Sequence, residues 1–330
     1  MTLLDRRQAL ALLAALPGAG LATVDQDARA TAWPGRTVRI VSPLTPGGPN
    51  DVSARLIGQR LQERFQIPFL IENRPGAATR IGNAAVARAA ADGTTLLYAS
   101  AALAILPSLY SNLPYDWRVS LSPITLAAMA PLFLVVGDQS PARDLDGFIA
   151  MARKRPSGLT FSGPGVATVP HLVTELFMRK LRVPGQTVHF NGEAAATVEL
   201  LADRVDATFT TLTSSLPHIQ RGKLRVLAVA SNQRSGIYPA APTLLEQGIG
   251  DVSGSAWFGF LSPAGLHPAV IDAIHAAIAD VLADPRVARA MAGAGLQATG
   301  SSTPTEFSTF IEAEARKWNG VIKDSNITVE

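Results

Sequence analysis

The stretch RIVSPLTPGGPNDVSARLIGQRL, Arg39 to Leu61, decides the fold class of this chain. Its first four residues predict a short buried strand, and from Val52 onward the apolar residues recur at helical spacing. Between them lies Pro-Gly-Gly-Pro-Asn-Asp, where the glycines allow close approach to the main chain and Asn50 or Asp51 suits the helix N-cap. A strand, a glycine turn and a helix N-terminus together favour an anion-binding site.

The same pattern recurs along the rest of the chain. Predicted strands at 69–73 and 94–100 flank an Ala-rich helix. A long apolar stretch at 124–137 is expected to carry the chain into a second domain, where the pattern restarts with a strand at 159–162 and the glycine loop Gly163–Thr168. This alternation predicts two α/β lobes with parallel sheets, whose ligands lie at the carboxyl ends of the strands. Two helix N-termini that face each other across a cleft can hold an anion from both sides.

The composition excludes several classes of protein. The chain has 330 residues, of which 47% are hydrophobic, and this is enough for two domains with separate cores. The net charge is +3, and the basic residues form no stripe with interleaved aromatics, so we expect no nucleic-acid binding. Cysteine is absent and no two histidines have the H-x-x-x-H spacing, so we expect neither a metal site nor a cofactor.

Residues 1–30 are predicted to be a cleavable signal peptide. Arg6 and Arg7 precede a short apolar core at 9–16, and Ala28-Arg29-Ala30 offers a cleavage site. The arginine pair partly resembles a twin-arginine signal, so the twin-arginine and general secretory routes both stay open. No later segment has the roughly 18 uninterrupted apolar residues of a membrane helix. We therefore expect a periplasmic protein that does not itself span the membrane.

No catalytic motif is evident in the sequence. The loop Gly163–Thr168 is spaced like a dinucleotide fingerprint, but Thr168 stands where the third glycine or alanine belongs. G-x-S-x-G and P-loop motifs do not occur. The acidic residues nearest the predicted cleft edge are Asp51 and Glu193. Asp51 could be a helix cap or could contact an ammonium group of the ligand. We expect His171 to be a structural group with its hydrogen bonds satisfied, and we predict no catalytic residues.

Seven segments from about Trp33 to the C-terminus resemble, in order, the Bug-type solute receptors of tripartite tricarboxylate transporters. They are VRIVSPLTPGGPNDVSARL, IENRPGAATRIG, LYSNLPYD, FSGPGVATVPHL, GKLRVLAVASNQR, APTLLEQGI and WFGFLSPAG. The resemblance implies a two-lobed α/β periplasmic binding protein, type II-like, with a hinge and no catalysis. It implies a small carboxylate ligand, held largely by backbone amides and water, and the inner-membrane transporter subunits as partners. We expect a monomer.

The resemblance also assigns lobes and site residues. We place lobe 1 at 31–127 and 253–330 and lobe 2 at 128–252. Thr210 stands where many family members have Asp, so we expect the second lobe to lack that acidic group. The implied ligand-binding residues are Leu44, Thr45, Gly47, Gly48, Asp51, Ser100, Ala101, Gly163, Gly165, Val166, Ala167, Thr168, Asn191 and Thr210.

The leading hypothesis is therefore a transport receptor for a small carboxylate, which could be a di- or tricarboxylate, an amino acid or an aromatic acid. Two alternatives remain open at this point. One is a periplasmic ligand sensor that feeds a signalling system. The other is a periplasmic enzyme built on the same fold, which would need a convergent acid–base or nucleophile set.

Overall fold

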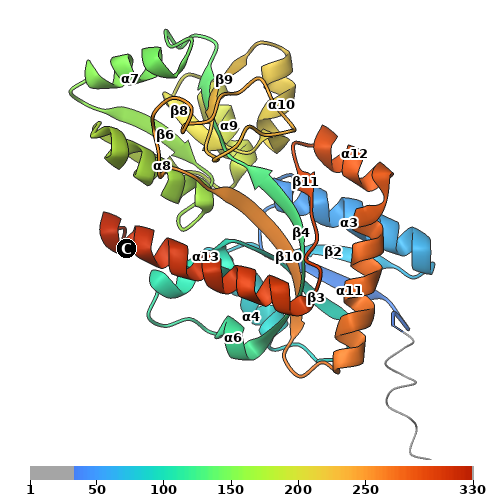
Figure 1. Ribbon diagram of the computed structural model, residues 1–330. Coiled ribbons are helices and arrows are strands. Elements are labelled where there is room, and N and C mark those ends of the chain that lie inside the picture. The colour runs from blue at the N-terminus through green and yellow to red at the C-terminus, as the bar shows by residue number, and fades with distance from the viewer. Residues whose placement is uncertain (1–32, 329–330) are drawn as a thin grey trace, which may run out of the picture.

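A computed structural model describes residues 33–328 and shows two α/β lobes, one above the other in Figure 1. The predicted signal peptide at 1–30 lies outside the described residues. The lower lobe in the figure carries both the first strands of the chain and its C-terminal helices, and the upper lobe is formed by the middle of the chain. The predicted fold class, a two-lobed α/β binding protein, is confirmed.

The first lobe is built on a six-stranded sheet with the order β11-β4-β10-β3-β1-β2. β1 pairs in parallel with β2 and β3, as predicted. The predicted parallel sheet covers only these three strands, because β10 re-enters from the other lobe and pairs antiparallel with both β3 and β4. The strands are β1 (Val38–Ser42), β2 (Phe69–Asn73), β3 (Thr95–Ser100), β4 (Leu121–Pro131), β10 (Ser255–Pro263) and β11 (Gln297–Ala298).

Helices cover both faces of this sheet. Alternate residues of each strand point to opposite faces, so Val38 and Ile40 pack with one set of helices and Val41 with the other. The first set is α3 (Pro49–Phe65), α11 (Pro268–Ala283) and α12 (Pro285–Gly293). The second set is α4 (Arg80–Ala87), the short α5 (Ala102–Ile105), η1 (Leu106–Ser108) and α6 (Trp117–Ser120), and the long α13 (Pro304–Ser325).

The second lobe repeats this plan on a five-stranded sheet with the order β7-β6-β8-β5-β9. β6 pairs in parallel with β7 and β8, and β5, which enters from the first lobe, pairs antiparallel with β8 and β9. The strands are β5 (Phe133–Gly137), β6 (Leu159–Gly163), β7 (Gly185–His189), β8 (Ala207–Thr210) and β9 (Leu224–Val229). The helices are α7 (Leu145–Arg153), α8 (Val169–Leu181), α9 (Glu193–Leu201) and α10 (Leu212–Gln220).

The two segments that join the lobes run side by side. β4 pairs with β10 as far as Pro131 and Ser255, and Leu132 alone separates β4 from β5. The Ala230 N–H donates to the Leu132 carbonyl at 2.8 Å, and the Gly254 N–H donates to the Ala230 carbonyl at 3.0 Å. The lobe boundary placed at 127/128 stays a prediction, and the pairing of β4 within the first sheet continues four residues beyond it.

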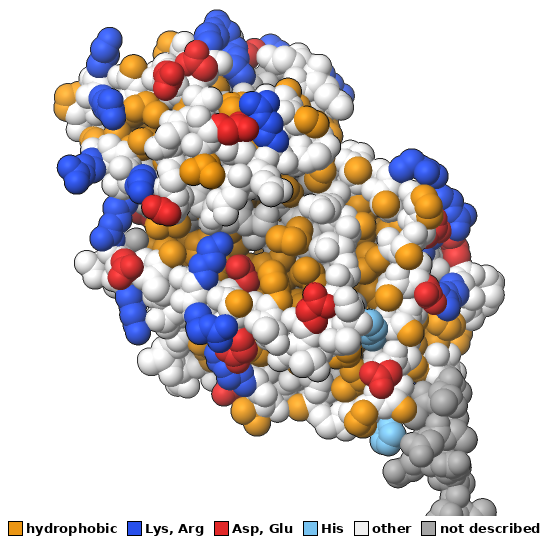
Figure 2. Space-filling view, viewed as in Figure 1, with side chains coloured by type: hydrophobic (Ala, Val, Ile, Leu, Met, Phe, Trp, Pro, Cys, Tyr) orange, Lys and Arg blue, Asp and Glu red, His pale blue; other side chains and the backbone are white. Residues whose placement is uncertain are grey.

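Figure 2 shows the face that carries α13, on which charged side chains are scattered over both lobes and hydrophobic ones gather in the hollow between them. α13 packs on β4 and α5 of the first lobe and also contacts α8 of the second. Within residues 33–328, no helix is both long enough and apolar enough to cross a membrane.

Candidate functional site

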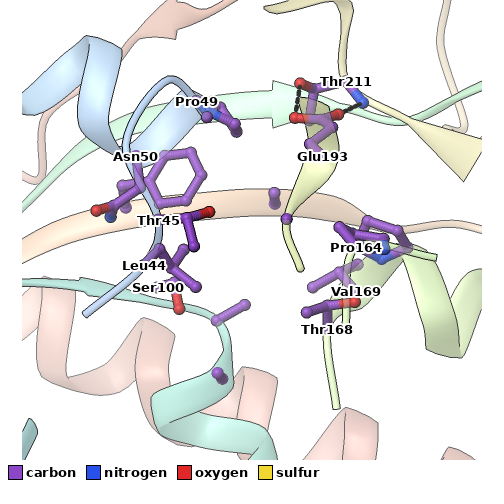
Figure 3. A pocket seen from close by; sticks show the side chains of 17 residues that line it. Leu44, Thr45, Pro49, Asn50, Ser100, Pro164, Thr168, Val169, Glu193 and Thr211 are labelled. Atoms are coloured by element: carbon purple, nitrogen blue, oxygen red, sulfur yellow. Dashed lines mark hydrogen bonds between the residues drawn. The ribbon is translucent and has the colours of Figure 1, made fainter. Parts of the chain in front are cut away.

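A cavity of about 90 Å³ lies between the lobes. Figure 3 shows Leu44, Thr45 and Pro49 of the first lobe on one side of it, and Pro164, Thr168 and Val169 of the second lobe on the other. Five of the loops around it follow the carboxyl ends of β1, β3, β6, β7 and β8, which is where ligands bind in parallel α/β sheets. The hinge strand β10 supplies Ala256 and Phe258.

The first glycine loop delivers the N-terminus of α3 to this cavity. The helix begins at Pro49 with Gly48 as N-cap, so the prediction of Asn50 or Asp51 as the cap is wrong. Proline suits the first helical position because its φ is already helical and it has no N–H to satisfy. Gly48 provides no side-chain cap, so the N–H groups of the first turn have no capping partner. These N–H groups are donors for an anion.

Asn50 and Asp51 hold this loop in place. The buried Asn50 accepts a hydrogen bond from Ser42 Oγ at 2.6 Å and donates to the Tyr98 carbonyl at 3.1 Å. Asp51 accepts from the Gly47 N–H and from Arg55 Nε, each at 3.0 Å. Burial raises the pKa of the Asp51 carboxyl, but these bonds and one from Asn73 outweigh it and bring the pKa below the usual value.

We expect Asp51→Ala to destabilise the protein by about 2 kcal/mol, since it removes a buried acceptor of charge-assisted hydrogen bonds. Thermal unfolding in the absence of ligand measures this loss. Asp146→Ala is the matched control, because Asp146 also lies in the first turn of a helix but is exposed. Equal melting temperatures for the two variants would contradict the role of Asp51 in holding the first glycine loop in place.

The second glycine loop delivers the N-terminus of α8 from the opposite lobe. Thr168 is the N-cap of this helix, where its Oγ1 accepts from the His171 N–H at 3.5 Å and donates to the Gly165 carbonyl at 2.8 Å. Gly165 at φ +143° and Ala167 at φ +62° bend the loop back toward the cavity wall. The Thr168 hydroxyl hydrogen is therefore engaged within the loop.

Glu193 is the one titratable side chain among the residues that line the cavity. It is 7% exposed and accepts hydrogen bonds from the Thr210 hydroxyl, the Thr211 N–H and, at 2.9 Å, the Thr211 hydroxyl. Burial raises the pKa of this carboxyl, although the hydrogen bonds oppose the rise. Thr210 lacks the carboxyl group of an aspartate, but the Glu193 carboxylate accepts a hydrogen bond from Thr210 and places an acidic group here.

The structure brings only part of the predicted set to the cavity. Six predicted residues line it: Leu44, Thr45, Gly48, Ser100, Ala101 and Thr168. Eight do not, and these are Gly47, Asp51, Gly163, Gly165, Val166, Ala167, Asn191 and Thr210. The lining residues outside the predicted ligand-binding set are Pro49, Asn50, Ala102, Pro164, Val169, Pro170, Gly192, Glu193, Thr211, Ala256 and Phe258. Their contact with a ligand, like that of the six, remains a prediction.

Two histidines pack against each other beside the second glycine loop. The rings of His171 on α8 and His189 at the end of β7 are nearly perpendicular, with centroids 4.5 Å apart. Burial, and then the neighbouring His189, lowers the pKa of His171 to about 4. The Nδ1 atoms of both rings are buried without a hydrogen-bond partner in the described part of the chain, so the expectation of a satisfied His171 is wrong. Residues 33–328 contain no group of three acidic or histidine side chains suited to a metal.

The fold and the cavity between its lobes define a two-lobed solute-binding protein. The model of the tripartite tricarboxylate transporter family receptor matches residues 53–327, and the chain belongs to this family. It is 34% identical to BugT of Bordetella pertussis over 298 residues, which is 90% of this chain and 91% of that protein. The resemblance predicted from the sequence motifs is thereby confirmed.

Two solved structures with bound ligands resemble this chain closely. An R. palustris protein solved with adipate is 30% identical, with a TM-score of 0.86 over 90% of this chain and 99% of that one. MatC from Rhodopseudomonas palustris with bound malate is 27% identical, with a TM-score of 0.79 over 88% of this chain and all of that one. Both of these relatives thus hold dicarboxylates.

Proposed function

We propose that this chain is a periplasmic receptor that binds a small carboxylate between its lobes and presents it to the membrane subunits of a tripartite tricarboxylate-type transporter. The observation that carries the proposal is the cavity, onto which the N-termini of α3 and α8 open from opposite lobes. Each helix N-terminus has a partial positive charge, which favours an anion, and the uncapped first turn of α3 adds N–H groups that can donate to it. The adipate and malate held by relatives support a carboxylate as that anion.

The lining of the cavity supports backbone and water contacts as the means of binding. Among the described residues, no lysine, arginine or histidine lines it. A carboxylate there has to be held by main-chain N–H groups, by the polar side chains of the lining and by ordered water, all of which can form good hydrogen bonds to it.

The same lining supports binding without catalysis. Acid–base and nucleophilic catalysis use a titratable group that is paired with another group to activate or orient it. Within the described lining the titratable side chain is Glu193, and its three hydrogen bonds come from threonines.

A thermal-shift screen tests the proposal. The protein is melted with mono-, di- and tricarboxylates and with amino acids. A ligand at 100 times its dissociation constant stabilises the folded state by about 2.7 kcal/mol. A carboxylate that raises the melting temperature supports the proposal, and a complete panel without any stabilising carboxylate contradicts it.

We expect Gly48→Val to weaken carboxylate binding at least tenfold without unfolding the protein. Gly48 has φ −84°, which any residue can adopt, and an added Cβ would meet only the Thr45 carbonyl at 3.9 Å. The extra methyl groups would therefore stand in front of the α3 N–H groups at little cost to the fold. Calorimetry beside a melting curve measures both effects.

Gly236→Val is the matched control for this variant. A Cβ at Gly236 would meet nothing within 4 Å, and Gly236 does not line the cavity. We expect this control to keep the affinity of the parent. Unchanged affinity in a folded Gly48→Val variant would contradict a role for the α3 N-terminus in binding.

A further inference from the structure

The end of the cavity formed by Gly48 of the first lobe and the end formed by Glu193 and Thr211 of the second lobe differ in the N–H groups that they offer to an anion. At the Gly48 end, the first turn of α3 has no side-chain cap. At the other end, the Thr211 N–H at the start of α10 already donates to the Glu193 carboxyl, as Figure 3 shows. A carboxyl group of the protein itself thus stands where a ligand anion would bind α10.

Among residues 33–328, no cationic side chain bonds to Glu193 to compensate its charge. Its hydrogen-bond donors are two hydroxyls and an amide, which are all neutral. Glu193 is also nine-tenths buried, so water screens its charge poorly. A second anionic group beside Glu193 would meet like-charge repulsion in a poorly screened site, which is an effective means of rejecting a ligand.

Glu193 retains the capacity to accept one more hydrogen bond. Its Oε1 accepts from Thr210 and Thr211, whereas Oε2 accepts only from the Thr211 hydroxyl in the described chain. A carboxylate oxygen has two acceptor positions, so Oε2 has one left. The lining of the cavity as a whole also includes the apolar side chains of Pro49 and Phe258. This end of the cavity therefore suits an apolar group or a hydrogen-bond donor.

We propose that the cavity selects a monocarboxylate whose far end is uncharged or carries a hydrogen-bond donor, and that Glu193 rejects dicarboxylates of the same length. This inference rests on the proposed function, because it takes one carboxylate at the α3 end as given. It sets the chain apart from the relatives solved with adipate and malate.

Calorimetry with matched pairs of acids tests the inference. In each pair a methyl group of the monocarboxylate takes the place of the second carboxylate: butanoate and succinate, hexanoate and adipate, 4-methylbenzoate and terephthalate. 6-Hydroxyhexanoate adds a donor at the far end. At pH 7.5 we expect the best monocarboxylate to bind at least tenfold more tightly than its dicarboxylate partner, and 6-hydroxyhexanoate to bind no more weakly than hexanoate.

Glu193→Gln keeps the shape of the side chain and removes its charge. We expect this variant to bring the two members of the best pair within threefold of each other, by strengthening the dicarboxylate. Glu175→Gln is the matched control, because Glu175 is a partly buried acid of the same lobe that bonds Thr187 and does not line the cavity. This control should keep the tenfold preference.

Two results would overturn the inference while the proposed function stands. One is a wild-type protein that binds the dicarboxylate as tightly as the monocarboxylate. The other is a preference that Glu193→Gln leaves unchanged. If no acid of either kind binds, the proposed function itself fails and the inference falls with it.

Discussion

Replacing Gly192 with alanine is expected to hold the lobes apart and to lower the affinity for a carboxylate at least tenfold. Gly192 is the N-cap of α9 in the second lobe, and a Cβ added there would overlap Thr45 Oγ1 of the first lobe. The backbone of Gly192, at φ +96° and ψ 170°, also lies in a region that is essentially restricted to glycine. The substitution therefore has two costs, steric overlap between the lobes and local backbone strain.

Thr45→Ala separates these two costs. In the double variant the overlap with Oγ1 is gone, whereas the strain at position 192 remains. Because the overlap exists only when the lobes are closed, we expect the double variant to regain most of the lost affinity. Because the backbone strain remains, we expect it not to regain the lost melting temperature. The parent, the two single variants and the double variant form a double-mutant cycle. The non-additive part of their binding free energies measures the contact between Thr45 and Gly192.

Small-angle scattering with saturating ligand gives an independent measure of closure. The parent and the double variant should show the smaller radius of gyration of the closed form, and Gly192→Ala alone should not. If Gly192→Ala binds and closes like the parent, contact between Thr45 and Gly192 does not limit closure.

Lowering the pH from 7 to 4 is expected to remove about 3 kcal/mol of folding free energy through His171 alone. The pKa of His171 is about 4 in the folded protein, against 6.5 for the unperturbed side chain. Between these values the unfolded state binds more protons than the folded state, so stability falls as the pH falls. Burial also lowers the pKa of His189, which adds to the loss, whereas burial raises the pKa of Glu175, which opposes it.

A comparison of variants isolates the contribution of His171. Chemical unfolding of the parent and of His171→Gln is measured at half-unit steps from pH 7 to pH 4. The free energies of the two proteins should converge toward low pH, because only the parent loses the contribution of His171. His218→Gln, on α10 and outside this histidine pair, controls for the loss of a histidine. Parallel curves for the parent and His171→Gln would contradict the prediction.

The fold could be predicted from the sequence because its signals are local. The strand, glycine loop and helix of Arg39–Leu61 are set by apolar periodicity and by the conformations that glycine allows. The order of the strands within the first sheet could not be predicted this way. β10 lies between β3 and β4 only because the chain returns from the second lobe, and no local pattern records that return.

The site was only partly predictable for the same reason. Leu44, Thr45 and Gly48 belong to one continuous loop, so they were found together. Phe258 reaches the cavity from the hinge strand, far along the chain, and nothing in its neighbourhood marks it. Glu193 is an ordinary acid at the start of a helix in the sequence. It becomes distinctive only when the fold places it beside Thr211, at the end of β8.

The side-by-side course of the two segments that join the lobes restricts how the molecule can open. Backbone hydrogen bonds through Leu132, Ala230 and Gly254 tie these segments into one narrow ribbon. A ribbon of this kind bends readily across its flat face and resists both sideways shear and lengthening. We therefore expect an opening motion with essentially one degree of freedom, which one inter-lobe distance would describe. Each closure would then return the outer surfaces of the lobes to the same relative orientation, and the proposed membrane partner could use that orientation to distinguish a loaded receptor from an empty one.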